Sequence, residues 1–184
     1  MKIVHRDIKS SNIFIHKVPF TNENILRIGD FGAATFLDEH ENILENRIGT
    51  PYYLAPEVIQ SYPYNYKSDM WSLGVIMYEI LTLRKPFYAK NLRTLSRKVL
   101  RAKYPPFPKY YSFSITKVIS SLLQREPSHR PSALSLLTLP QLLVHIPLEY
   151  KHSLLRVLYP SVYSPLYIME ANYLYTPPCV TNDM

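Results

Sequence analysis

The pattern of hydrophobic and polar positions along the 184-residue chain predicts two short strands followed by a series of helices. Apolar clusters at residues 13–15 and 25–28 are typical of strands, and the turn-forming residues between them predict a hairpin. Helices are expected at residues 68–83, 90–102, 114–124 and 132–145, separated by proline-bearing turns. The fold class is therefore mainly α with a few short strands, an α+β arrangement.

Candidate chemistry lies close to the first residue. The eight residues from His5 to Asn12 read H-R-D-I-K-S-S-N. Phosphoryl transfer needs an acceptor for the proton of the substrate hydroxyl, a cation near the moving phosphate and an oxygen ligand for magnesium. Asp7, Lys9 and Asn12 carry these three functional groups, so this segment is a candidate catalytic loop.

Four further motifs follow in a fixed order. They are D-F-G at Asp30, Phe31 and Gly32, G-T-P-Y-Y-L-A-P-E from Gly49 to Glu57, S-D-M-W-S-L-G from Ser68 to Gly74, and H-R-P-S from His129 to Ser132. A single motif of this kind is weak, whereas five in the right order are a strong signal. Together they resemble the C-terminal lobe of a eukaryotic protein kinase over roughly residues 1–145.

Details of these motifs narrow the resemblance. Lys9 in the catalytic loop and G-T-P before A-P-E are similar to the serine/threonine branch, and residues 3–9, 49–54 and 69–83 resemble the NIMA-related kinases. The implied activity is ATP-dependent transfer of a phosphoryl group to Ser or Thr of protein substrates. The resemblance implies that Asp7 and Lys9 are catalytic, that Lys9 also contacts ATP, and that Asn12 and Asp30 bind its Mg²⁺.

The same resemblance implies supporting roles for other residues. Glu57 and Arg130 are expected to form a partly buried salt bridge, and Asp69 is expected to hold the backbone of H-R-D. Other residues with expected structural or regulatory roles are His5 and Phe31 in internal packing, Gly32 in D-F-G, Arg6 opposite a phosphate on the activation segment, and Thr50 in the substrate loop.

The glycines bear on ATP binding. All four lie within the kinase motifs, so the sequence contains no G-x-G-x-x-G loop, and no V-A-I-K strand precedes H-R-D. The expectation is a C-lobe fragment with the N-lobe absent, the ATP cradle largely missing and little activity on its own. The alternative is a truncated, kinase-derived module that binds other proteins and transfers nothing.

The net charge of +7 is concentrated in the predicted helix at residues 90–103. A solvated basic face on an amphipathic helix is the simpler interpretation, and the sharper one is docking of an acidic protein partner. Nucleic-acid binding is disfavoured because no aromatic-interleaved basic motif accompanies the charges. The histidines show no metal-ligand spacing.

Composition separates the last residues from the rest. Prolines and tyrosines alternate across residues 146–184, which predicts a partly ordered tail or, alternatively, an extended strip that packs on the lobe or binds a partner. The single Cys179 allows no internal disulfide, and no apolar run is long enough to span a membrane. An intracellular, cytoplasmic protein without membrane attachment is expected, with cytoskeletal association suggested only by the family resemblance.

Overall fold

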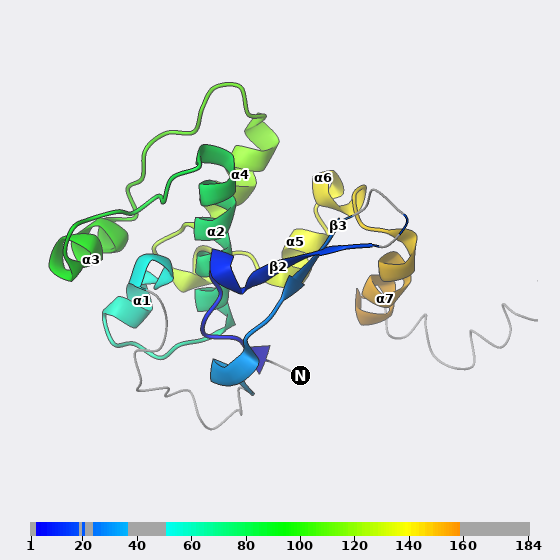
Figure 1. The fold of residues 1–184 in the computed structure, drawn as a ribbon, viewed down its shortest axis with the longest axis horizontal. Helices are drawn as coiled ribbons and strands as arrows, with labels where there is room; N and C mark the ends of the chain where they lie inside the picture. The colour runs from blue at the N-terminus through cyan, green and yellow to red at the C-terminus, as the bar shows by residue number, and fades with distance from the viewer. Residues whose placement is uncertain (1–2, 19, 21–23, 37–50, 159–184) are drawn as a thin grey trace, which may run out of the picture. The chain divides into compact units, whose positions relative to one another are not determined.

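The computed structural model describes residues 3–18, 20, 24–36 and 51–158 (Figure 1). The chain divides into two compact units, residues 1–137 and residues 138–184. The strands are β1 (Ile3–Val4), β2 (Ile13–Lys17), β3 (Asn24–Ile28) and β4 (Thr35–Phe36), and the helices are α1 (Pro56–Ile59), α2 (Tyr66–Thr82), α3 (Leu92–Arg101), α4 (Phe113–Leu122), α5 (Ala133–Leu137), α6 (Pro140–Leu143) and α7 (Leu148–Leu158). The predicted class, mainly α with a few short strands, is confirmed.

The four strands form two antiparallel pairs. β2 pairs with β3 in the register that places Ile13 opposite Ile28, which confirms the predicted hairpin. β1 pairs with β4, and Ile3 lies opposite Phe36. This second pair was not predicted, because two-residue strands leave no periodic pattern in a sequence.

Helix α2 is the central element of the first unit (Figure 1). It begins with a capping box in which the Asn65 side chain accepts from the backbone N–H of Lys67, and the Ser68 hydroxyl accepts from the backbone N–H of Asn65. Gly74 lies where α2 meets α4, since a Cβ at this position would come within 2.8 Å of the Leu122 Cβ. Glycine therefore permits the close approach of the two helices.

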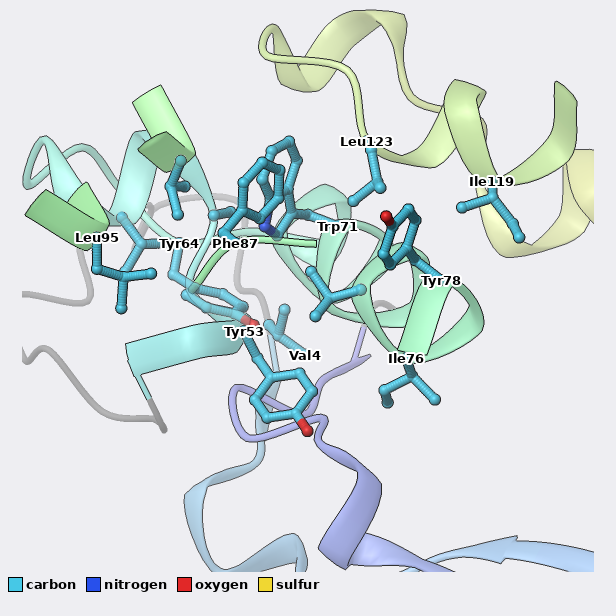
Figure 2. Close-up of a cluster of buried hydrophobic side chains, with 14 residues drawn as sticks. Val4, Tyr53, Tyr64, Trp71, Ile76, Tyr78, Phe87, Leu95, Ile119 and Leu123 are labelled. Carbon is cyan, nitrogen blue, oxygen red and sulfur yellow. The ribbon is translucent and has the colours of Figure 1, made fainter. Parts of the chain in front are cut away.

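The hydrophobic core surrounds α2 (Figure 2). Trp71 and Val75 are fully buried, and the Trp71 ring stacks on Phe87 with centroids 5.4 Å apart. Val4 of β1 is also fully buried in this cluster. Because Val4 directly precedes His5, the core fixes the start of the candidate catalytic loop.

One helix prediction is wrong at its C-terminal end. The predicted helix at residues 132–145 is two short helices, α5 and α6. Leu139 is extended, with φ −65° and ψ 128°, because the ring of Pro140 disfavours a helical conformation in the residue before it. Pro140 then occupies the first turn of α6, where no backbone N–H is required.

The second unit contains a helix within the predicted tail. α7 (Leu148–Leu158) lies between Pro147 and Pro160, so the prolines bound a helix rather than exclude one. Residues 159–184 lie outside the described residues, and the predicted domain boundary at residue 145 stays a prediction. Within the described ranges, none of the helices is long and apolar enough to cross a membrane.

Candidate active site

Asp69 in the first turn of α2 anchors the candidate catalytic loop. Its carboxylate accepts hydrogen bonds from the backbone N–H of His5 at 2.8 Å and of Arg6 at 3.1 Å, and the Tyr64 hydroxyl donates to it at 2.8 Å. Burial raises the pKa of Asp69, and these donors oppose that rise by favouring the charged form. The loop backbone is thus tied directly to the central helix.

The His5 side chain joins this loop to the D-F-G segment. His5 is buried, its Nε2 lies 3.1 Å from the backbone oxygen of Gly29, and its ring centroid lies 4.8 Å from that of Phe31. Phe31 is 58% exposed, so the contact with His5 covers only part of its ring. A Cβ at Gly32 would lie 3.4 Å from an Asp30 carboxylate oxygen, which is ordinary contact.

The four residues predicted to be catalytic or metal-binding lie together in one polar cluster. The Lys9 ammonium lies 2.5 Å from the Asp7 carboxylate, and this hydrogen bond raises the pKa of Lys9. The Asn12 amide nitrogen donates to the Asp7 carboxylate at 3.3 Å and to the Asp30 carboxylate at 3.4 Å. A carboxylate, an ammonium and two oxygen-bearing side chains therefore share one small region.

The hairpin explains why residues 12 and 30 meet. Asn12 immediately precedes β2, and Asp30 comes two residues after the end of β3. Antiparallel pairing brings these two ends together, and the backbone N–H of Gly29 donates to the Asn12 carbonyl at 2.9 Å. Asp30 has a left-handed backbone with φ 62°, a conformation that Asp tolerates better than most residues.

The cluster suits a magnesium ion that accompanies phosphates. Mg²⁺ prefers oxygen ligands and is commonly held by one or two carboxylates together with substrate phosphates and water. Asp30 offers a carboxylate, and Asn12, whose amide nitrogen now donates to Asp30, would offer its amide oxygen after rotation of the amide group. Throughout the part of the chain that the structure describes, this cluster included, no three His, Cys, Asp or Glu side chains gather into an all-protein metal site.

Arg6 has a left-handed backbone, with φ 68°, and its Nε donates to the carbonyl of Ala33. The activation segment that it is expected to face is predicted at residues 33–48, and residues 37–48 of it, together with Thr50, lie outside the described residues. The expected phosphate contact of Arg6 and the expected role of Thr50 stay predictions.

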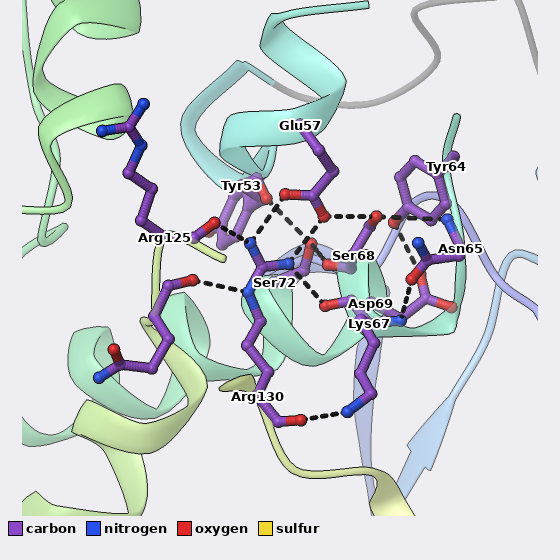
Figure 3. A network of polar contacts seen from close by, with 11 residues as sticks. Tyr53, Glu57, Tyr64, Asn65, Lys67, Ser68, Asp69, Ser72, Arg125 and Arg130 are labelled. Atoms are coloured by element: carbon purple, nitrogen blue, oxygen red, sulfur yellow. Dashed lines mark hydrogen bonds and ion pairs between the residues drawn. The ribbon is translucent and has the colours of Figure 1, made fainter. Parts of the chain in front are cut away.

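Glu57 and Arg130 form a buried, bidentate salt bridge (Figure 3). The two terminal nitrogens of the Arg130 guanidinium, Nη1 and Nη2, each donate to one carboxylate oxygen of Glu57 at 2.7 Å. The Ser68 hydroxyl donates to the same carboxylate at 2.7 Å. Arg130 Nε donates to the backbone oxygen of Gln124, and the guanidinium lies 5.0 Å from the Trp71 ring centroid. The two remaining N–H groups donate to the backbone oxygens of Lys67 and Arg125, so all five donors of Arg130 have partners within the protein.

A second polar cluster, next to the candidate catalytic loop, was not predicted from the sequence. The Tyr53 hydroxyl lies 2.8 Å from Ser10 Oγ, donates to Glu79 at 2.8 Å and accepts from Lys85 at 2.9 Å. Lys85 also pairs with Glu79 at 3.0 Å; burial lowers the pKa of Lys85, but the bonds to Tyr53 and Glu79 outweigh it and raise that pKa. Glu79 is the lone carboxylate within the apolar run from Met70 to Leu83, which was the available signal.

Comparisons with known proteins show the family of the chain. A family model described as "Protein kinase domain" matches residues 1–142. The serine/threonine-protein kinase Nek4 of Mus musculus is 42% identical over 146 residues, which cover 79% of this chain and 18% of that protein. The probable serine/threonine-protein kinase nek3 of Dictyostelium discoideum is 45% identical over 139 residues, which cover 75% of this chain and 12% of that protein. The serine/threonine-protein kinase Nek5 of Homo sapiens is 44% identical over 139 residues, which cover 76% of this chain and 19% of that protein. The chain therefore spans less than a fifth of the length of these three relatives.

Proposed function

The chain belongs to the protein kinase family and is related to its Nek serine/threonine kinases, and we propose that it supplies the catalytic lobe for ATP-dependent phosphorylation of Ser or Thr in protein substrates. The observation that carries this proposal is the convergence of Asp7, Lys9, Asn12 and Asp30 at one end of the β2–β3 hairpin. These groups match the needs of phosphoryl transfer one for one.

Asp7 is proposed as the group that accepts the proton of the substrate hydroxyl. Its side chain is 14% exposed, so a hydroxyl can reach it, and Lys9 and Asn12 hold it in one orientation. A carboxylate fixed in this way costs little reorganisation when the proton arrives. The raised pKa of Lys9 keeps its ammonium charged, as a group beside a moving phosphate requires.

Asn12 and Asp30 are proposed to hold magnesium together with the phosphates of ATP. When bound, the ion would neutralise charge on the transferring group. The residues on this chain contribute orientation, since the Gly29–Asn12 backbone hydrogen bond fixes the spacing of the two side chains. Asp30→Asn is therefore expected to weaken Mg-ATP binding, measured by calorimetric titration, while the exposed Glu126→Gln is not.

The 184-residue polypeptide by itself is proposed to bind Mg-ATP weakly and to transfer phosphate slowly. Its sequence has no G-x-G-x-x-G loop to enclose the phosphates, although the metal-binding side chains are present. Losing even one preorganised stabilising donor commonly costs about 10²–10³ in rate. A low-micromolar dissociation constant for Mg-ATP would contradict this proposal.

The phosphoryl-transfer proposal is tested by adding what the sequence does not contain. A fusion that places the ATP-binding lobe of a related kinase before residue 1 is expected to phosphorylate Ser and Thr, but not Tyr, in a mixed peptide substrate. Asp7→Asn should abolish the activity because an amide cannot accept the proton, whereas Glu126→Gln should leave it intact. Full activity in the Asp7→Asn fusion would refute the assignment.

A second candidate function is a non-catalytic module that binds acidic proteins. The observation in its favour is the charge of residues 80–125, which contain no Asp or Glu. They contain the cations Arg84, Lys85, Lys90, Arg93, Arg97, Lys98, Arg101, Lys103, Lys109, Lys117 and Arg125. A field of one sign over this length attracts partners of the opposite sign. Acidic-peptide binding that persists in the Asp7→Asn variant would support this function independently of catalysis.

A further inference from the structure

A hollow of about 490 Å³ lies beside the C-terminal half of α3. Four cationic side chains and two tyrosines line it together with two prolines, and no carboxylate does. The residues that matter are Lys85, Tyr88, Lys98, Arg101, Lys103 and Tyr104. The hollow is therefore a concave site whose charged side chains are all positive.

Three of its four cations have no acidic partner among the described residues. Lys85 pairs with Glu79, but Lys98 donates only to the backbone oxygen of Tyr88, at 2.8 Å. Arg101 and Lys103 are exposed, and no ion pair involves either of them within residues 51–158. Unpaired cations at this density repel one another, and an anionic ligand would relieve that repulsion.

The walls of the hollow are fixed by the core. Leu95 and Val99 bury one side of α3, which leaves Lys98 and Arg101 on its solvent side. The Tyr104 ring packs edge-on against Tyr78, with ring centroids 5.5 Å apart. Lys98 and Arg101 are thus presented from a helix that packs on the core, which reduces the ordering cost of binding.

We propose that this hollow binds an acidic segment of a partner protein, with two or three carboxylates facing Lys98, Arg101 and Lys103. The inference rests on the second candidate function above and gives it a location. Arginine pairs well with carboxylates through two parallel hydrogen bonds, and the volume lies within the range of about 300–1,000 Å³ that is typical of ligand pockets.

The rings in the hollow favour a peptide over a nucleic acid. Single-stranded nucleic acids bind through aromatic faces on which the bases stack. Tyr88 already stacks on Tyr52, with centroids 5.9 Å apart, and Tyr104 already packs against Tyr78, Phe87 and Phe107. Tyr88 is 60% exposed and keeps one open face, so the hollow offers a single free ring rather than the row of aromatic faces on which successive bases stack.

The test is fluorescence anisotropy with the full chain and a labelled nonapeptide that contains four glutamates. Arg101→Gln with Lys103→Gln is expected to weaken binding about tenfold or more. Arg93→Gln with Arg97→Gln removes the same charge from exposed positions of α3 outside the hollow and should weaken binding less than about threefold. The same peptide with glutamine in place of glutamate should not bind.

The outcomes distinguish the second candidate function, binding of acidic proteins, from the proposal that the hollow is the binding site. If the Arg93 and Arg97 pair weakens binding and the Arg101 and Lys103 pair does not, the basic surface binds acidic peptides but the hollow is not the site. If neither pair matters, both ideas fail. Tighter binding of a twelve-residue oligothymidylate that also depends on Arg101 and Lys103 would overturn the peptide proposal in favour of nucleic acid.

A second measurement needs no variant and so does not depend on variant folding. The glutamate peptide is expected to protect Lys98 and Lys103 of the wild-type chain from acetylation. Lys109 and Lys117 are exposed and lie outside the hollow, so they serve as internal controls. Equal protection of all four lysines, or of none, would contradict the proposed site.

Discussion

At the scale of single residues, the pair of Glu57 and Arg130 dominates the interior. Arg130 is 1% exposed and Glu57 is 6% exposed, so removing the charge of one partner leaves the other charged group buried, with neither an ionic partner nor water around it. Glu57→Gln is expected to lower the free energy of unfolding by about 3–5 kcal/mol, measured by urea denaturation. Glu126→Gln, which breaks an exposed pair with Arg125 at 3.9 Å, should cost less than about 1 kcal/mol. Equal losses in the two variants would refute the buried-pair argument.

Asp69 gives the stability of the chain a defined dependence on pH. Burial raises the folded-state pKa of Asp69 above its ordinary value of 3.8, so folding favours the protonated form. This contribution is fully present below the unfolded-state pKa and is lost as pH rises through the folded-state pKa. The difference in unfolding free energy between the wild type and Asp69→Asn is therefore expected to shift against the wild type as pH rises from about 4 to 7.

The measurement is urea denaturation of both proteins at several pH values. Ser114→Ala is the control, because it changes an exposed side chain that does not titrate, and its difference from the wild type should stay constant across the range. A wild-type advantage over Asp69→Asn that grows with pH would contradict the assigned direction of the pKa shift.

At the scale of elements, sequence patterns predicted the long helices and the hairpin, but not the separate helices α5, α6 and α7 that the structure describes after residue 132. The helix at 132–145 was predicted from its apolar content, and the single Pro140 divides it. The proline-rich tail was predicted to be partly ordered or an extended strip, and the eleven residues of α7 between two prolines are an ordered part that this prediction did not locate. In both places the position of each proline, rather than proline density, determined the outcome.

The start of α2 offers an element-scale prediction. Asn65→Ala removes the side-chain oxygen that accepts from Lys67, and it is expected to lower the free energy of unfolding by about 1 kcal/mol. Asn65→Asp keeps that acceptor and should cost little. Asn91→Ala removes the equivalent cap of α3, where the side chain accepts from the backbone N–H of Thr94, and is expected to have a similar cost. Urea denaturation that ranks Asn65→Asp with Asn65→Ala would exclude the cap as the cause.

At the scale of the whole molecule, the sequence was sufficient to predict which candidate side chains come together but not the groups that surround them. Asp7 and Asn12 stand in one motif, and the predicted hairpin was sufficient to bring Asp30 to them. The cluster of Tyr53 and Lys85, and the hollow beside α3, join segments that no local pattern relates. Such long-range contacts depend on packing around α2, which periodicity does not encode.

The β2–β3 hairpin leaves the first unit with exposed apolar surface. Ile15 is 69% exposed and Leu26 is 64% exposed, and the register places them directly opposite each other. Among the described residues, β2 and β3 pair only with each other, so each also has an unpaired edge. Exposed apolar side chains next to free strand edges favour association between copies of a chain.

The purified 184-residue chain is therefore expected to self-associate in a concentration-dependent manner, measured by sedimentation velocity. Ile15→Thr with Leu26→Thr keeps strand propensity but removes two apolar side chains, each contributing about 1.5–3 kcal/mol if buried between copies. The dissociation constant should rise at least about a hundredfold. His16→Thr with Arg27→Thr changes the same strands at exposed polar positions and should leave association unchanged. A wild-type chain that sediments as a monomer at every concentration would show that this apolar surface is tolerated in water.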